Sequence, residues 1–369
     1  MSRRRQSDFH QCRPPTISAS SAPNCAEPAT KAVKAGLDPT KDSGQSRRLS
    51  RRIAVTYPKS HSPTLEAPYI AMQTPQPATE VSTGIRHNAR NHISDNYVLP
   101  ADDSERERLN SQHRVLKQSF DGRLILAPVI LKSGDRVLDS GTGAGSWLID
   151  FASEVQSTIS IYGIDISTRL FPSDPPPNVS FLNASITQLP EDWTSTFALV
   201  NQRLLFGGLT AAAWQAAFSE MYRVLVPGGW VNLYEFNGDI DRMGWEPGPS
   251  TKKMFLMTRE TYRRSGVLID AVYHLPGWLK GAGFINIHTE LKTVPMNGEK
   301  GKPMRENKCS ALAAMKTPAL RAGGFGFVHS EEDFDNLVAE MRNELVVTED
   351  ASIHTFMIYA QKPVSGGRE

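Results

Sequence analysis

The chain has 369 residues, of which 39% are hydrophobic and 22% charged, an ordinary composition for one large globular domain or two small ones. No apolar run approaches the ~20 residues that span a bilayer, and the N-terminus lacks the apolar core of a secretory signal, which argues against a membrane or secreted protein. The three cysteines lie far apart and match no metal-ligand spacing, so we expect no metal site and an intracellular setting, cytoplasmic or nuclear.

Residues 1–93 are rich in Ser, Pro, Thr, Ala and basic residues, and they cannot bury enough apolar surface to offset chain entropy. We therefore expect a disordered tail. Residues 1–90 hold 14 Lys and Arg against 6 Asp and Glu, and the rest holds 27 against 33. The basic clusters at 3–5 and 47–52 indicate a nuclear import signal, a tether for an acidic protein partner, or simply a solubilising tail, and Asp8 disfavours a mitochondrial transit peptide.

The first predicted helix lies within Asn96–Phe120. Leu109, His113 and Leu116 recur there at helical spacing and form one face, and the aspartates before them can cap its N-terminus. His113 has two interpretations, a residue of a binding pocket or a partly buried histidine with its hydrogen bonds satisfied.

The most informative stretch is RVLDSGTGAGSW, residues 136–147. Its apolar start predicts a buried strand that ends at Asp139, and a helix is predicted over Ser146–Val155. Between them lie three alternate glycines, Gly141, Gly143 and Gly145. Glycine allows a tight turn and a close approach by a ligand, and the loop presents helix N-terminal amides. Strand, glycine loop and helix together open a nucleotide-binding βαβ unit.

Four further strands follow, each within a short apolar run. The first, residues 160–166, ends in an acid, Asp165, which suits the two hydroxyls of a ribose, although an Asp can also cap a short helix. The remaining strands are predicted at 179–182, 197–201 and 230–236. Thr210 caps a helix running to about Leu225, with a turn at 226–229. Alternating strands and helices predict an α/β fold with a doubly wound, parallel sheet.

The C-terminal part reads as helical over 250–282, with a break near Gly266. Strands are predicted at 284–294 and 354–361. Two helices are predicted between those strands, over 308–320 and 330–345, and the second begins with a Ser-x-x-Asp capping pattern.

These segments resemble the class I S-adenosylmethionine-dependent methyltransferases. The matching pieces, in the family's order, are VLDSGTGAG (137–145), GIDIS (163–167), VSFLNASITQLP (179–190), FALVNQRLL (197–205) and EMYRVLVPGGWVNLYEF (220–236). Residues 97–116 are similar to the corresponding segment of the fungal LaeA-like methyltransferases. The resemblance implies a mostly parallel seven-stranded sheet, in which the last two strands form an antiparallel pair at one edge. It also implies one methyltransferase domain at 94–369, with a cofactor core at 130–240 and a helical substrate cap with edge strands at 250–362.

The resemblance also assigns residues to S-adenosyl-L-methionine. Asp139 and the loop would hold the amino acid tail, because a carboxylate pairs with its ammonium, and Asp165 would bind the ribose. Ile166 would pack on the adenine. Ser185 stands where the family often has an Asp, a weaker acceptor whose role Asn183 could share. The full set of expected cofactor-binding residues is Asp139, Gly141, Thr142, Gly143, Gly145, Asp165, Ile166, Ser185, Ile186, Tyr97 and Gln112.

Methyl transfer needs alignment and a dry pocket, and it needs a base only where the acceptor loses a proton. The sequence contains no catalytic signature. The candidate catalytic residues are Glu235, His113 and Asn201. Glu235 lies at the carboxyl end of the fifth strand, where such sheets bind ligands, but it could equally pair with Arg242 or a backbone amide.

The sequence is compatible with three functions. The leading prediction is a methyltransferase for a small-molecule acceptor in fungal secondary metabolism. The second is a LaeA-like nuclear regulator that acts through protein partners. The third is a nicotinamide-dependent oxidoreductase, which Asp139 disfavours because it would repel a pyrophosphate. No motif for direct nucleic-acid binding accompanies the fold.

Overall fold

The computed structural model describes residues 92–94, 97–100 and 103–364, the first two segments as backbone only. These two segments form an antiparallel pair, β1 (His92–Ser94) and β2 (Tyr97–Pro100). β1 therefore includes two residues that the sequence analysis assigned to the tail. The predictions for residues 1–91 lie outside the described residues. Within the described part of the chain, no helix has the length and apolar character needed to cross a bilayer.

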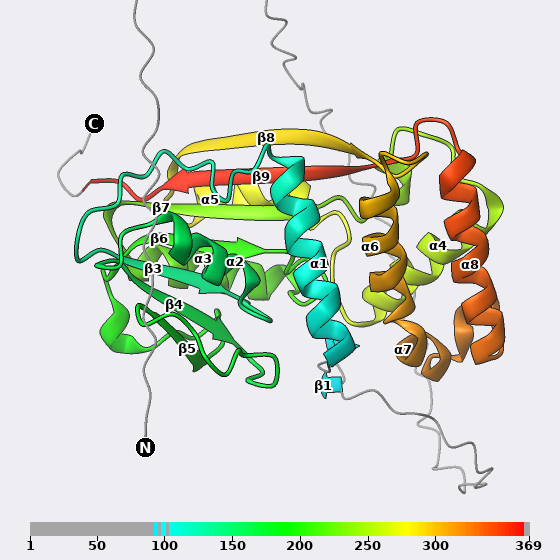
Figure 1. Ribbon diagram of the computed structural model, residues 1–369, viewed down its shortest axis with the longest axis horizontal. Helices are drawn as coiled ribbons and strands as arrows, with labels where there is room; N and C mark the ends of the chain where they lie inside the picture. Colours follow the sequence, from blue (N-terminus) through cyan, green and yellow to red (C-terminus); the bar gives the residue numbers. More distant parts are fainter. Residues whose placement is uncertain (1–91, 95–96, 101–102, 365–369) are drawn as a thin grey trace, which may run out of the picture. The chain divides into compact units, whose positions relative to one another are not determined.

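A seven-stranded sheet forms the centre of the described structure, in the order β5-β4-β3-β6-β7-β9-β8 (Figure 1). The first five of these strands are mutually parallel, and β9 is antiparallel to both β7 and β8. The predicted fold, with an antiparallel pair at one edge, is confirmed. The strands are β3 (Arg136–Ser140), β4 (Ser160–Asp165), β5 (Val179–Asn183), β6 (Phe197–Arg203), β7 (Leu225–Phe236), β8 (Ile285–Pro295) and β9 (Ser352–Gln361).

Helices cover both faces of this sheet because both faces of its strands are apolar. On one face, α2 packs over Val137, Ile161 and Leu199. On the other, α3 and α5 pack over Leu138 and Val200, the next residues along the same strands. Strand order reverses between β3 and β6, so the carboxyl edge there is the expected place for a ligand. The helices of these layers are α1 (Asp103–Ser119), α2 (Ser146–Glu154), α3 (Ala211–Val224) and α5 (Leu275–Gly281).

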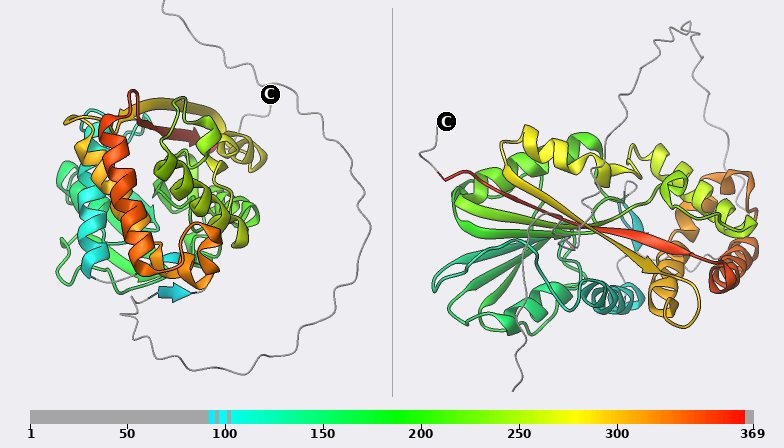
Figure 2. Two further views of the ribbon diagram at one scale, coloured as in Figure 1. Left: turned by 90° about the vertical axis from the view of Figure 1, so that its right-hand side faces the viewer. Right: turned by 90° about the horizontal axis from the view of Figure 1, so that it is seen from above.

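A helical cap stands at the carboxyl edge of the parallel strands. Its helices are α4 (Pro249–Arg264), α6 (Lys302–Ala313), α7 (Lys316–Arg321) and α8 (Glu331–Val347). The last three are inserted between β8 and β9, where the sequence predicted two helices. Figure 2 shows α1, α6 and α8 side by side, and α4 packs on α8. The cap shares one apolar core with α1 and the end of β7, where Tyr234 and Phe236 lie.

Several element boundaries differ from the sequence prediction, including the following three. The segment 226–229, predicted as a turn, lies within β7, where the register shifts and Gly228 has a φ of +84°. β6 continues past its predicted end at Asn201 to Arg203. The helix predicted over 308–320 is two helices, α6 and α7. Short 3-10 helices complete the fold, namely η1 (Glu191–Trp193), η2 (Ile240–Arg242), η3 (Ala271–Tyr273) and η4 (Gly323–Gly326).

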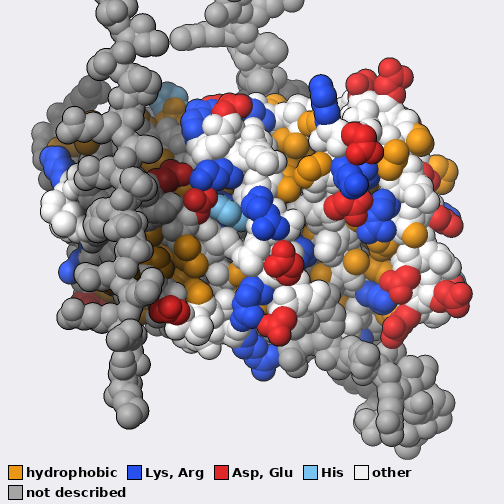
Figure 3. Space-filling model, in the orientation of Figure 1, with side chains coloured by type: hydrophobic (Ala, Val, Ile, Leu, Met, Phe, Trp, Pro, Cys, Tyr) orange, Lys and Arg blue, Asp and Glu red, His pale blue; other side chains and the backbone are white. Residues whose placement is uncertain are grey.

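Ion pairs fasten α1 to the sheet domain. The ammonium of Lys117 lies 2.8 Å from a carboxylate oxygen of Asp150 and 2.9 Å from one of Glu154, both on α2. Positive and negative side chains are interspersed on the face shown in Figure 3. Because α2 begins directly after the glycine loop, the two ion pairs of Lys117 hold α1 beside that loop.

Candidate cofactor and substrate site

The glycine loop turns back on the tip of β4. Gly141, Gly143 and Gly145 have φ values of +64°, +55° and +73°, a left-handed backbone that favours glycine. The amide of Gly143 donates to Oδ2 of Asp165 at 2.9 Å. The amide of Thr142 donates to the carbonyl of Ile164 at 2.9 Å. The two predicted strand-tip acids therefore lie on either side of one loop.

Packing also favours glycine in this loop. A Cβ at Gly141 would lie 2.7 Å from the side chain of Leu205, and one at Gly145 would lie 2.7 Å from Phe181. At Gly143 the distance to the side chain of Leu109 would be 3.1 Å. The sequence predicted that the absence of side chains at these glycines leaves space for a ligand. In the structure, the side chains of Leu205, Phe181 and Leu109 occupy part of that space.

Asp139 is buried at the end of β3 and is held by two donors. Its Oδ2 accepts from the hydroxyl of Thr142 at 2.7 Å, and its Oδ1 accepts from Nδ2 of Asn201 at 2.8 Å. Burial raises the pKa of Asp139, while nearby Arg203 and the two donors oppose that rise. Asn201 itself accepts from Nδ2 of Asn232 at 2.9 Å. Asn201 thus positions Asp139, and the catalytic role considered from sequence stays a prediction.

Arg203 is a site residue that sequence reasoning missed, although it lies in the matching segment FALVNQRLL. With Asp139 it lines a small hollow between α1 and the glycine loop. Its Nη1 lies 3.2 Å from Nδ1 of His113, and Nε2 of His113 lies 2.9 Å from a carboxylate oxygen of Asp150. Burial and the Arg203 charge lower the pKa of His113. His113 is therefore the partly buried, hydrogen-bonded histidine, behind the hollow.

Glu235 supports the loop that follows β6. Its Oε1 accepts from the amide of Leu205 at 2.9 Å and its Oε2 from the amide of Phe206 at 3.3 Å. Burial raises the pKa of Glu235 to about 8. The sequence left open whether this acid is catalytic or bonded to a backbone amide, and the structure shows the second arrangement.

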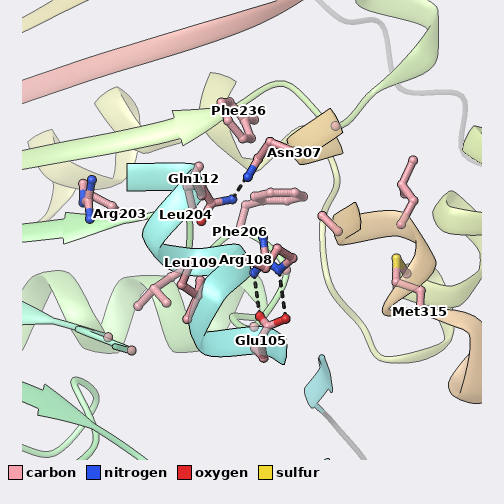
Figure 4. A pocket seen from close by; sticks show the side chains of 18 of the residues that line it. Glu105, Arg108, Leu109, Gln112, Arg203, Leu204, Phe206, Phe236, Asn307 and Met315 are labelled. Carbon is pink, nitrogen blue, oxygen red and sulfur yellow. Dashed lines mark hydrogen bonds and ion pairs between the residues drawn. The ribbon is translucent and has the colours of Figure 1, made fainter. Parts of the chain in front are cut away.

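One cavity joins the glycine loop to the cap (Figure 4). At the sheet end it is lined by Gly141, Gly143 and Asp165. At the cap end its walls come from α1, α4, α6 and the loop after β6, and they include Arg108, Leu109, Gln112, Phe206, Tyr262, Met304, Asn307, Lys308, Leu312 and Met315. Most of these cap-side residues could not be found from sequence, because they come from separate segments without a shared motif.

Several residues predicted to bind the cofactor are not among those that line this cavity. Ile166 is 52% exposed. Ile186 is buried in the core beneath α3, and the hydroxyl of Ser185 lies 2.8 Å from that of Thr187. Gln112 does line the cavity, whereas the side chain of Tyr97 lies outside the described residues. Among the described residues, no group of three His, Cys, Asp or Glu side chains could hold a metal ion.

The strand order, the glycine loop and the two strand-tip acids together define an α/β protein that binds a nucleoside cofactor. Comparison with known proteins makes the class specific. Residues 137–229 match the methyltransferase domain family. The N-methyltransferase tcpN of Claviceps purpurea is 31% identical over 66% of this chain and 89% of that protein. The N-methyltransferase verN of Clonostachys rogersoniana is 33% identical over 72% of this chain and 93% of that protein.

The chain belongs to the class I S-adenosylmethionine-dependent methyltransferases. It is an enzyme of that family, and its cofactor is S-adenosylmethionine rather than a nicotinamide dinucleotide. A solved phosphoethanolamine N-methyltransferase 2 of Haemonchus contortus aligns at 21% identity over 69% of this chain and 52% of that chain, with a TM-score of 0.42.

Proposed function

We propose that the enzyme transfers a methyl group from S-adenosylmethionine to a nitrogen atom of a small molecule in fungal secondary metabolism. The observation that carries this proposal is the single cavity that runs from the glycine loop to the apolar cap. A cofactor and a small acceptor placed end to end would share that space. Two fungal relatives that align with this chain over about nine tenths of their own length are N-methyltransferases, which supports nitrogen as the attacked atom.

In this proposal, the hollow beside α1 holds the zwitterionic tail of the cofactor. Asp139 would pair with the ammonium, and Arg203, which lines the same hollow, would pair with the carboxylate. Asp165 would accept hydrogen bonds from the ribose hydroxyls, as the sequence predicts. Asn201 and His113 would act on these contacts indirectly, because they hold Asp139 and Arg203 in place.

The acceptor would occupy the cap side of the cavity. Bound S-adenosylmethionine supplies an electrophilic methyl group, and the chain supplies alignment and a dry wall. Tyr262, Leu312 and Met315 line that side and are each at most 6% exposed. Their role would be to exclude water and to hold the acceptor in line with the methyl group.

The decisive test combines binding with product analysis. We expect calorimetry to show binding of S-adenosylmethionine and of S-adenosylhomocysteine, and labelled methyl transfer from the cofactor into a small-molecule fraction of fungal extract. Mass spectrometry of the labelled product should place the methyl group on nitrogen. Label found only in protein, or on carbon or oxygen, would contradict the proposal.

A LaeA-like regulatory role is the second candidate. It is favoured by the basic clusters at 3–5 and 47–52 and by Ser185 in place of the family's Asp. A pull-down from nuclear extract, with the full chain and with a chain lacking residues 1–93, distinguishes it. Partners that are captured only by the full chain would support regulation, and equal capture by both would count against it.

A further inference from the structure

Three buried hydrogen-bond donors face the cap side of the cavity. Arg108, Asn307 and Lys308 line it and are 8%, 5% and 9% exposed. Among the described residues, Nη1 of Arg108 and Nδ2 of Asn307 are buried without a hydrogen-bond partner. Burying a donor without an acceptor costs free energy, so two such atoms on residues that line one cavity indicate that something else supplies acceptors.

The neighbouring groups leave these donors free. Glu105 pairs with Nε and Nη2 of Arg108, at 2.8 and 2.6 Å, which leaves Nη1. Gln112 donates to Oδ1 of Asn307 at 3.4 Å, which occupies the acceptor of that amide and leaves its donor (Figure 4). The two helices that carry these side chains, α1 and α6, pack against each other.

Lys308 adds a positive charge to the same wall. Within the described residues its ammonium lies over the ring of Phe255, 5.0 Å from the centroid, and forms no ion pair with a carboxylate. Among the described residues, two carboxylates line the cavity. Glu105 is paired with Arg108, and Asp165 accepts from the Gly143 amide at the sheet end. Burial lowers the pKa of Lys308 to about 8, as expected for a cation without a compensating anion.

We infer that Arg108, Asn307 and Lys308 form a subsite for an oxygen atom of the methyl acceptor, either a carboxylate or an amide carbonyl. The inference deepens the proposed function and rests on it. The acceptor then has an apolar body, which packs on Tyr262, Leu312 and Met315, and an oxygen acceptor that three donors from α1 and α6 hold. An ammonium in that position is excluded, because it offers only donors and the wall carries a positive charge.

Three matched probes test the chemistry of the subsite. Phenylacetate, phenylacetamide and phenethylamine carry the same ring with a carboxylate, an amide or an ammonium. Their dissociation constants are measured by ligand-observed NMR on the full chain saturated with S-adenosylhomocysteine. We expect at least one oxygen-bearing probe to bind tenfold or more tightly than the amine. Tighter binding of phenylacetate identifies a carboxylate as the group that the subsite binds, and tighter binding of phenylacetamide identifies an amide carbonyl.

Variants tie that preference to the named side chains. Lys308→Met keeps the length of the side chain and removes its charge, and we expect the tenfold preference to disappear. Asn307→Asp replaces the free donor by an acceptor and should have the same effect. Lys316→Met is the control, because Lys316 pairs with Asp335 outside the cavity, and it should retain the preference.

The outcomes separate the subsite from the function itself. Equal binding of the three probes, binding of none, or an unchanged preference in Lys308→Met overturns the subsite. Affinity for S-adenosylhomocysteine within twofold of the parent shows that each variant is folded. If the parent protein itself does not bind S-adenosylhomocysteine, the result would instead contradict the proposed methyltransferase site.

Discussion

Three acids at strand ends do three different things in this protein. Asp139 lines the hollow beside α1 and is held by Thr142 and Asn201. Asp165 lines the main cavity and accepts from the Gly143 amide. Glu235 accepts from two amides of the loop after β6. All three are carboxylic acids at or next to the last residue of a strand, so only the neighbours distinguish an acid proposed to bind the cofactor from one that supports a loop.

The first prediction concerns Gly143. Gly143→Val places a branched side chain at a φ of +55°, and its Cβ would lie 3.1 Å from Leu109 in the cavity wall. We expect cofactor binding, measured by calorimetry, to be lost while the circular dichroism spectrum stays that of the parent. Gly134→Val is the matched control, because Gly134 also has a positive φ, +90°, with nothing within 4 Å of its Cβ position. Unchanged affinity in Gly143→Val would contradict the assignment of the loop.

The second prediction concerns Asp165. Asp165→Ala removes the acceptor proposed for the ribose hydroxyls and should weaken S-adenosylmethionine binding by about 1–3 kcal/mol, the usual effect of losing a charged hydrogen bond. Asp135→Ala is the control, because Asp135 accepts from the Lys132 amide in a turn at the far end of β3. The ribose assignment fails if calorimetry gives both variants the affinity of the parent.

The third prediction concerns pH and Glu235. Its pKa is raised by burial to about 8, so between pH 4.5 and 8 the folded chain holds a proton that the unfolded chain has released. Stability from this group is therefore greatest at low pH and falls as pH rises, by at most about 1.4 kcal/mol per pH unit. Urea unfolding of Glu235→Gln at pH 5 to 8 should show a flatter dependence than the parent. Parallel curves would disprove the raised pKa.

At the scale of elements, the cap depends on how α8 holds the start of α4. Glu344 on α8 accepts from the amides of Ser250 and Thr251 at 2.9 and 2.7 Å, in the first turn of α4. Gly248 precedes that turn, and a Cβ there would lie 2.5 Å from the Glu344 carboxyl carbon. A carboxylate is favourable at a helix N-terminus, so this contact fixes one wall of the cavity.

The fourth prediction follows from that contact. Glu344→Gln keeps one acceptor oxygen and turns an amide toward a donor. It should therefore lower the free energy of unfolding, measured with urea at pH 7, by about 1–3 kcal/mol. Burial alone would raise the pKa of Glu344, but the bonds from Ser250 and Thr251 outweigh it and lower the pKa. The difference from the parent should therefore be complete above pH 4.5 and disappear as pH falls through the folded pKa. Exposed Glu349, changed to Gln, should show no difference at either pH.

At the scale of the whole molecule, the ligand cavity is lined both by the sheet with its helices and by the cap. Its walls come from the carboxyl edge of the sheet, from α1 and from the cap. The same cap core extends to Tyr234 and Phe236 at the end of β7. A ligand in the cavity therefore contacts both layers and is expected to stabilise them together.

The fifth prediction tests that coupling. S-adenosylhomocysteine at 100 times its dissociation constant should add about 2.7 kcal/mol to the free energy of unfolding, because it binds only the folded chain. The gain should appear as one cooperative melting transition at higher temperature in differential scanning calorimetry. NADH at the same concentration is the control and should leave the transition where it was. A cap that melts separately with the ligand bound would contradict the coupling.

Much of the fold could be read from local patterns. Apolar runs bounded by acids, glycines and prolines gave the strands of the sheet, and Thr210 and Ser330 cap their helices as predicted. The errors fall where tertiary contacts override local signals. One example is the segment 226–229, which lies within β7 but loops out of its pairing with β6 between Leu225 and Trp230. The backbones of Gly228 and Gly229 bond instead to Lys362.

The sequence by itself determined the α/β class, the position of the glycine loop, and the placement of Asp139 and Asp165 beside it. Each of these depends on residues that are close in the chain. Only the tertiary structure decided that Glu235 accepts from the amide of Leu205 and that Asn201 donates to Asp139. It also decided that Arg108 on α1 lines the same cavity as Asn307 and Lys308 on α6. The physical reason is that local periodicity sets which elements form, whereas a side chain's partners depend on which distant elements pack against it.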